Sequence, residues 1–100
     1  MIGGLEIDWR QRYGPWAVVA GASTGIGASF SEQLAARGLN LVMIALTGTG
    51  LTQQAARLEQ RHGIATLCLE MDLADASAVA RLPDLIARRQ VGLLVYVACH

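Results

Sequence analysis

The chain has 100 residues, 53% of them hydrophobic, and its 8 basic and 8 acidic side chains cancel to a net charge of zero. Disordered chains are less apolar and more strongly charged, so this composition predicts a folded protein. The length suits one domain over residues 1–100, because domains usually contain about 50–250 residues. Balanced charge provides no basic surface for nucleic acid or for an anionic membrane, so we expect neither as a partner.

The basic residues are all arginine, and the chain contains no lysine. This excludes chemistry that needs a lysine ammonium, such as a Walker A phosphate loop or a Schiff base. The two cysteines, Cys68 and Cys99, lie in separate apolar runs without a second cysteine at metal-binding or redox spacing. We therefore expect reduced, buried thiols and no metal site.

The amino-terminal residues differ from a secretory signal, which would carry basic residues before an apolar core. Here Glu6 and Asp8 are acidic. The longest apolar stretch, residues 91–99, has about half of the ~20 residues that a membrane-spanning helix needs. The sequence thus predicts a cytoplasmic protein that does not span a membrane.

The predicted elements begin with a short helical turn, because Leu5, Trp9 and Tyr13 are spaced four residues apart. Four short aliphatic runs follow, without the alternation that marks a half-exposed strand. Runs of this kind are typical of strands buried on both faces of a parallel sheet. These predicted strands are residues 16–20, 41–46, 65–69 and 93–98.

Segments with helical spacing separate the strands. The first helix is expected to stop at Gly38 and the second at Gly63, since glycine readily adopts the left-handed conformation that ends helices. The apolar stripes that indicate them are Ile26, Phe30 and Leu34 in the first and Leu51, Ala55 and Leu58 in the second.

A third helical stripe starts at Val79 and Leu82, but Pro83 interrupts it. Proline removes a backbone donor and disfavours helix in the preceding residue, so we expect a break there and a new turn through Arg88. Strands that alternate with helices predict right-handed βαβ units. The expected fold class is α/β, with a three-layer arrangement around a parallel sheet of about four strands.

The most specific pattern is the sequence GASTGIG, which directly follows the first strand and leads into a helical stripe. Gly21 permits a tight turn, Gly25 lets a pyrophosphate approach the backbone, and Gly27 lets the helix pack closely on the strand. Ser23 and Thr24 supply hydroxyl groups and can cap the helix. Because a helix amino terminus attracts anions, the loop predicts a cradle for nucleotide phosphate, and a structural glycine turn is the alternative.

The end of the second strand should select the cofactor. In dinucleotide-binding folds an acid there binds the ribose 2′-hydroxyl of NAD, whereas an arginine suits the 2′-phosphate of NADP. This chain has Ala45, Leu46 and Thr47 at that place, neither acid nor base. The cofactor is NADP or NAD, and the missing acid favours NADP slightly, with Ser23 and Thr47 as possible contacts to its 2′-phosphate.

The third strand ends close to Asp72, at the edge where open parallel sheets bind ligands. Its carboxylate could accept a hydrogen bond from an adenine amino group. Equally, it could be a turn or capping acid ahead of Asp75 and Ala76.

The glycine loop, the Asp72-Leu73 pair and the sequence LLVYVAC together resemble the short-chain dehydrogenase/reductase family over about residues 15–99. The resemblance implies a Rossmann fold with strand order 3-2-1-4 that binds NAD(H) or NADP(H). It implies adenine contacts near Asp72 and Leu73 and places Ala98 beside the cofactor ribose. The pyrophosphate and ribose contacts it implies are Gly21, Ser23, Ile26 and Gly27.

The sequence departs from the family at two kinds of position. Val97 and Cys99 replace the asparagine and glycine that flank the alanine at position 98. The family also uses a tyrosine followed four residues later by lysine as its acid/base pair. Tyr13 and Tyr96 have no such lysine, so we assign no catalytic residue.

These observations favour the amino-terminal, cofactor-binding part of an NAD(P)-dependent oxidoreductase, with little or no turnover by itself. The whole enzyme would move hydride between a nicotinamide and a carbonyl or alcohol. The first alternative is a non-enzymatic nucleotide-binding or protein-interaction module. The second is half of an S-adenosylmethionine-dependent methyltransferase, which the missing acid after the second strand disfavours.

In the expected strand order the fourth strand, residues 93–97, lies at an edge and is apolar on both faces. Unpaired backbone groups at such an edge recruit other chains. We therefore expect self-association through the fourth strand.

Overall fold

The computed structural model describes residues 9–87 and 89–97. Helices and strands alternate along this part of the chain, after a short first helix. They are α1 (Trp9–Tyr13), β1 (Trp16–Ala20), α2 (Gly25–Ala36), β2 (Asn40–Ala45), α3 (Leu51–His62), β3 (Thr66–Glu70), α4 (Ala76–Ala80), α5 (Leu82–Ile86) and β4 (Val91–Tyr96).

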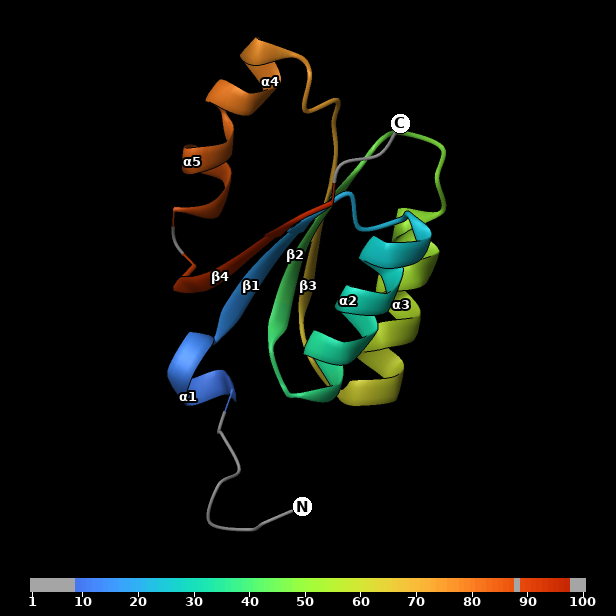
Figure 1. Ribbon diagram of the computed structural model, residues 1–100, viewed down its shortest axis with the longest axis vertical. Helices are drawn as coiled ribbons and strands as arrows, with labels where there is room; N and C mark the ends of the chain where they lie inside the picture. The colour runs from blue at the N-terminus through green and yellow to red at the C-terminus, as the bar shows by residue number, and fades with distance from the viewer. Residues whose placement is uncertain (1–8, 88, 98–100) are drawn as a thin grey trace, which may run out of the picture.

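The four strands form one parallel sheet in the order β3-β2-β1-β4. Helices α2 and α3 lie on one face, and α4 and α5 lie on the other (Figure 1). The predicted α/β class, parallel pairing and strand order are confirmed. All four strands end on the same side of the molecule, where the β1–α2 and β2–α3 loops meet the β3–α4 connection.

The first strand has the predicted bounds, 16–20, whereas the bounds of the other three differ from the prediction by one or two residues. The second strand is Asn40–Ala45 instead of 41–46, and the third is Thr66–Glu70 instead of 65–69. The fourth was predicted too late, at 93–98, because pairing with β1 sets its limits: Trp16 pairs with Val91, and Ala20 with Tyr96. Composition does not reveal where a partner strand ends.

The face under α2 and α3 is closely packed. Leu39, Leu41 and Met43 are fully buried there, together with Leu51 and Leu58 of α3. The second predicted helix stripe therefore faces the core as expected. Its stop at Gly63 is also confirmed, since this residue caps α3 in the left-handed conformation.

The helix that the first stripe indicated is confirmed, but of the three stripe residues only Leu34 is buried. Ile26 is 64% exposed and Phe30 is 43% exposed. The residues of α2 that face the sheet are Gly27, Ser31, Leu34 and Ala35. Because α2 lies close to the sheet, mainly small side chains fit between them, and the larger Ile26 and Phe30 remain exposed to solvent.

The helical region after β3 breaks next to Pro83 as predicted, but the new helical turn ends at Ile86, before the predicted limit at Arg88, which lies outside the described residues. Helix α4 ends at Ala80, and α5 begins at Leu82 with Pro83 in its first turn. Each helix has only 5 residues. The short leading helix α1 is also present, and its end packs on β4: a Cβ at Gly92 would lie 2.3 Å from the carbonyl oxygen of Tyr13.

A charged cluster joins α2 to α3. The Glu32 carboxylate accepts a hydrogen bond from Nη1 of Arg61 at 2.7 Å and also contacts Nε2 of His62. The hydrogen bond with His62 is the main cause that lowers the pKa of Glu32 below its usual 4.5, and Arg61 adds to it. A lowered carboxyl pKa means that ionised Glu32 stabilises the fold above the ordinary pKa, and that this contribution disappears as the pH falls through the folded-state pKa.

We expect Glu32→Gln to reduce the free energy of unfolding at pH 6 by at most about 1 kcal/mol, because half-exposed ion pairs contribute little. Urea titrations of both proteins should show the difference shrinking as the pH falls below 4.5. High salt should shrink it as well. A difference that grows in acid would contradict this account.

Candidate functional site

The β1–α2 turn is tied to the end of β2. Gly21 has φ +82°, a conformation that side chains disfavour, and a Cβ there would lie 2.6 Å from the carbonyl oxygen of Val97. The N–H groups of Gly21 and Ala22 both donate to the carbonyl of Ile44, at 2.9 and 3.0 Å. The turn is thus held between β2 and the end of β4.

Gly27 sets how closely α2 approaches this turn. A Cβ at Gly27 would lie 1.9 Å from the carbonyl oxygen of Gly21, a distance that no side chain tolerates. Its predicted role in close helix packing is confirmed. The first turn of α2 consequently packs against the backbone of Gly21, and a short loop joins it to the carboxyl end of β1 (Figure 1).

Thr24 locks the same turn as the N-cap of α2. Its Oγ1 accepts from the N–H of Gly27 and donates to the carbonyl of Gly21, both at 3.0 Å. The hydroxyl therefore satisfies one helix donor and holds the loop closed below it. Ser23, the other predicted cap, does not cap α2.

The outer side of the turn is open. A Cβ at Gly25 would meet nothing within 4 Å. In the described part of the chain, no hydrogen bond engages the N–H groups of Ser23, Gly25 and Ile26. Free donors at the positive end of the 12-residue helix α2 form a surface that suits an anion.

A cavity of about 200 Å³, here called the strand-tip cavity, opens beside the turn at the carboxyl ends of the strands. It joins Gly21 with Asp72 and Leu73, three of the predicted site residues. Ala98 lies outside the described residues, next to the lining residue Val97. The full lining is Gly21, Ile44, Ala45, Leu46, Met71, Asp72, Leu73, Ala74, Tyr96 and Val97.

Asp72 forms a turn and also borders the cavity. Its Oδ1 accepts from the N–H of Ala74 at 2.9 Å. Asp75, rather than Asp72, caps α4, and hydrogen bonds from Ser77 lower the pKa of Asp75. The turn interpretation of Asp72 is thus confirmed, while its place in the cavity leaves a ligand role available.

The end of β2 has a neighbour that the sequence analysis missed. Ala45 pairs in register with Glu70, the last residue of β3. Oε2 of Glu70 accepts from the N–H of Gly48, in the β2–α3 loop, at 3.3 Å. Spacing along the chain gives no sign of this contact, because it depends on the register of two strands 25 residues apart.

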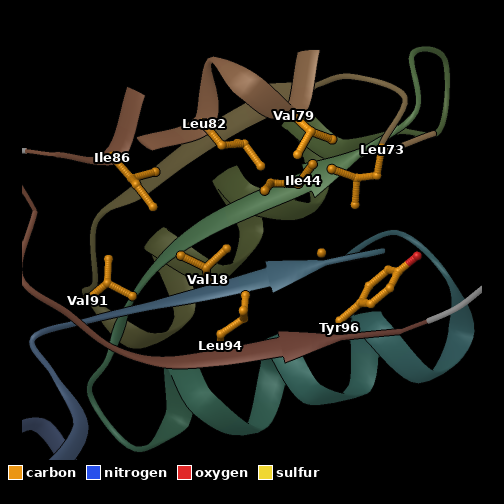
Figure 2. A pocket seen from close by; sticks show the side chains of 10 residues that line it. Val18, Ile44, Leu73, Val79, Leu82, Ile86, Val91, Leu94 and Tyr96 are labelled. Carbon is orange, nitrogen blue, oxygen red and sulfur yellow. The ribbon is translucent and has the colours of Figure 1, made fainter. Parts of the chain in front are cut away.

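A second, larger cavity was also not predicted. This apolar cavity, about 400 Å³, lies between the sheet and helices α4 and α5. Val18, Ile44 and Leu94 enter it from the strands, facing Val79 and Leu82 (Figure 2). It adjoins the strand-tip cavity, since Ile44, Leu73 and Tyr96 border both.

Residues 15–99 match the family model described as short chain dehydrogenase. The chain belongs to the short-chain dehydrogenase family. It is 30% identical over 93 residues to a 7beta-hydroxysteroid dehydrogenase from Clostridium sardiniense, covering 93% of this chain and 36% of that protein.

Solved structures of short-chain dehydrogenases have the same architecture. A structure of a 7beta-hydroxysteroid dehydrogenase matches with a TM-score of 0.87 and 29% identity over 94% of this chain. L-sorbose reductase from Gluconobacter frateurii, complexed with NADPH and L-sorbose, matches with a TM-score of 0.80 and 27% identity over 88% of this chain. This chain spans 36% and 34% of those two chains.

Residues 9–87 and 89–97 contain neither a candidate membrane-spanning helix nor a candidate metal site. None of their helices is long and apolar enough to cross a membrane. No group of three or more histidine, cysteine, aspartate or glutamate side chains is arranged there to hold a metal ion.

Replacing Gly25 and Gly27 by alanine, one at a time, distinguishes a glycine that faces open space from one packed against the backbone. Gly27→Ala should lower the free energy of unfolding by at least about 2 kcal/mol, because its Cβ has no room beside the Gly21 carbonyl. Gly25→Ala should change it by less than about 1 kcal/mol. Urea denaturation of both variants measures this, and equal losses would contradict the turn geometry.

Proposed function

We propose that the β1–α2 turn and the strand-tip cavity bind a nicotinamide dinucleotide, and that this chain is the cofactor-binding part of an oxidoreductase. The whole protein would transfer hydride between the nicotinamide and a carbonyl or alcohol. The observation that carries the proposal is the open face at Gly25, bordered by three free N–H groups at the start of α2. Membership in the short-chain dehydrogenase family supports the oxidoreductase class.

The residues fit the parts of such a cofactor. The pyrophosphate would lie over Gly25 and accept from the N–H groups of Gly25 and Ile26, with the Ser23 hydroxyl as a further donor. Gly21, Thr24 and Gly27 would shape this cradle without blocking it.

The adenine would occupy the strand-tip cavity. Asp72 uses Oδ1 in its own turn, so we assign its Oδ2 to the adenine amino group, with Leu73 packing alongside. Ala98 would approach the cofactor ribose next to the nicotinamide. These assignments place the dinucleotide across the carboxyl ends of the strands, where open α/β sheets bind ligands.

The 100 residues supply binding without an acid/base pair. The chain contains no lysine, and Tyr13 and Tyr96 are followed four residues later by Ala17 and His100. We therefore propose that this chain alone gives little or no turnover. Hydride transfer would depend on groups beyond these residues.

The thiol of Cys68 supports the cytoplasm as the compartment. Cys68 is free and partly buried, and burial raises its pKa, with Glu59 and Glu70 adding to the effect. Free cysteines are typical of reducing compartments, so we propose that the protein is cytoplasmic.

Calorimetric titration of the chain with NADH, NADPH and S-adenosylmethionine tests the cofactor proposal. We expect binding of a nicotinamide dinucleotide and none of S-adenosylmethionine. Gly25→Val should abolish binding yet stay folded, because the added side chain fills only the space assigned to the pyrophosphate. Ala56→Val, on the exposed side of α3, is the matched control and should bind like the wild type.

Three outcomes would overturn the proposal in different ways. Binding of S-adenosylmethionine alone would favour a methyltransferase. Binding of none of the three would favour a protein-interaction module. Dinucleotide-dependent oxidation of an alcohol, or reduction of a carbonyl, by this chain would refute the assignment of no catalytic residue.

We also propose that the chain self-associates by pairing β4 with β4 of a second copy. Strand β4 lies at the edge of the sheet and contains neither a charged residue nor a proline to discourage pairing. Leu94 is 68% exposed and Tyr96 is 66% exposed on one of its faces. An edge with free backbone groups and exposed apolar side chains is suited to a copy of itself.

Leu94→Lys should convert the associated protein into a monomer, because a charge on β4 opposes pairing with an identical strand. Light scattering and sedimentation at high protein concentration measure this. Val79→Lys, which also charges the apolar cavity but away from the strand edge, should leave the association intact. A monodisperse wild-type monomer would contradict edge pairing.

A further inference from the structure

The end of β2 lacks the side chain that normally discriminates between the two nicotinamide dinucleotides. In dinucleotide-binding folds this position holds the ribose of the adenosine half, and an acid here accepts from its 2′-hydroxyl. The last residue of β2 is Ala45, which is buried and apolar. Ribose selection by this chain must come from elsewhere.

The neighbouring strand places a carboxylate beside this gap. Glu70 pairs in register with Ala45, and paired residues of adjacent strands project from the same face of a sheet. That face is the one covered by α2 and α3, since Ala45 belongs to the core beneath these helices. The carboxylate therefore extends from the face and the end of the sheet where an acid at residue 45 would act.

A contact with the β2–α3 loop holds this carboxylate in place. Oε2 of Glu70 accepts from the N–H of Gly48, which leaves Oε1 for another donor. Glu70 itself is exposed. An anchored, accessible carboxylate oxygen can accept a hydrogen bond from a ribose hydroxyl.

The charges on β2, β3 and the segments that follow them disfavour the ribose 2′-phosphate of NADP(H). Residues 38–56, which include β2 and the loop after it, contain no charged side chain. Residues 64–80 contain three acids, Glu70, Asp72 and Asp75, and no base. The nearest base along the chain from the loop, Arg57, lies more than one turn into α3.

We infer that Glu70 replaces the missing acid of β2: it accepts from the adenosine 2′-hydroxyl, repels a 2′-phosphate and thereby selects NAD(H) over NADP(H). The inference rests on the dinucleotide site proposed above. It differs from the slight preference for NADP that the sequence analysis favoured, because it takes into account the carboxylate of Glu70, which pairs in register with Ala45.

The test compares binding of NADH and NADPH by the 100-residue chain and its variants, measured by calorimetry. The wild type should bind NADH at least about tenfold more tightly than NADPH, because like charges this close repel strongly. Glu70→Gln should reduce that ratio about tenfold, mainly by tightening NADPH. Added salt should reduce the wild-type ratio as well, since it screens exposed charges.

Two control variants test whether position or total charge matters. Glu70→Asp keeps the carboxylate and should retain the preference for NADH. Asp84→Asn removes an acid on α5, on the other face of the sheet, and should leave the ratio unchanged. Thermal unfolding of each variant establishes that it is folded.

The outcomes separate this inference from the cofactor proposal. If both dinucleotides bind and the ratio is the same in wild type and Glu70→Gln, the inference is overturned while the site stands. Preference of the wild type for NADPH would overturn it too. If neither dinucleotide binds, the site is refuted and the inference fails with it.

Discussion

The contact between Gly27 and the carbonyl of Gly21 is the constraint on which the rest of the site depends. With no Cβ at residue 27, the first turn of α2 lies against the Gly21 carbonyl that follows β1, and Thr24 joins both ends of the turn through one hydroxyl. The helix therefore presents its free N–H groups at the strand ends instead of burying them. Gly21 and Gly27 face the backbone of the turn and of Val97, whereas Gly25 faces open space.

The two faces of the sheet differ in how completely they are covered. Helices α2 and α3 have 12 residues each and bury a continuous core, whereas α4 and α5 have 5 residues each and leave an apolar cavity. Helices this short have too little apolar surface to cover the sheet by packing against it. The closely packed face carries the glycine turn, and the loosely covered face adjoins the strand-tip cavity through Ile44, Leu73 and Tyr96.

Much of the architecture could be predicted because local patterns in this chain agree with the fold. Continuous aliphatic runs indicated parallel strands, and Pro83 marked the break between α4 and α5. The glycines at 21 and 27 were correctly interpreted because each has a steric role that no other residue fills. The stripe at Ile26 and Phe30 misled, since spacing indicates a helix but not which side of it faces the sheet.

By itself the sequence determined the alternation of strands and helices and the shape of the β1–α2 turn, because both arise from residues close together in the chain. The tertiary structure decided what surrounds that turn. Pairing with β1 set the limits of β4, and pairing between β2 and β3 brought Glu70 beside Ala45. Register is a property of two strands together, so the pairing of Glu70 with Ala45, 25 residues earlier along the chain, could not be recognised from local sequence patterns.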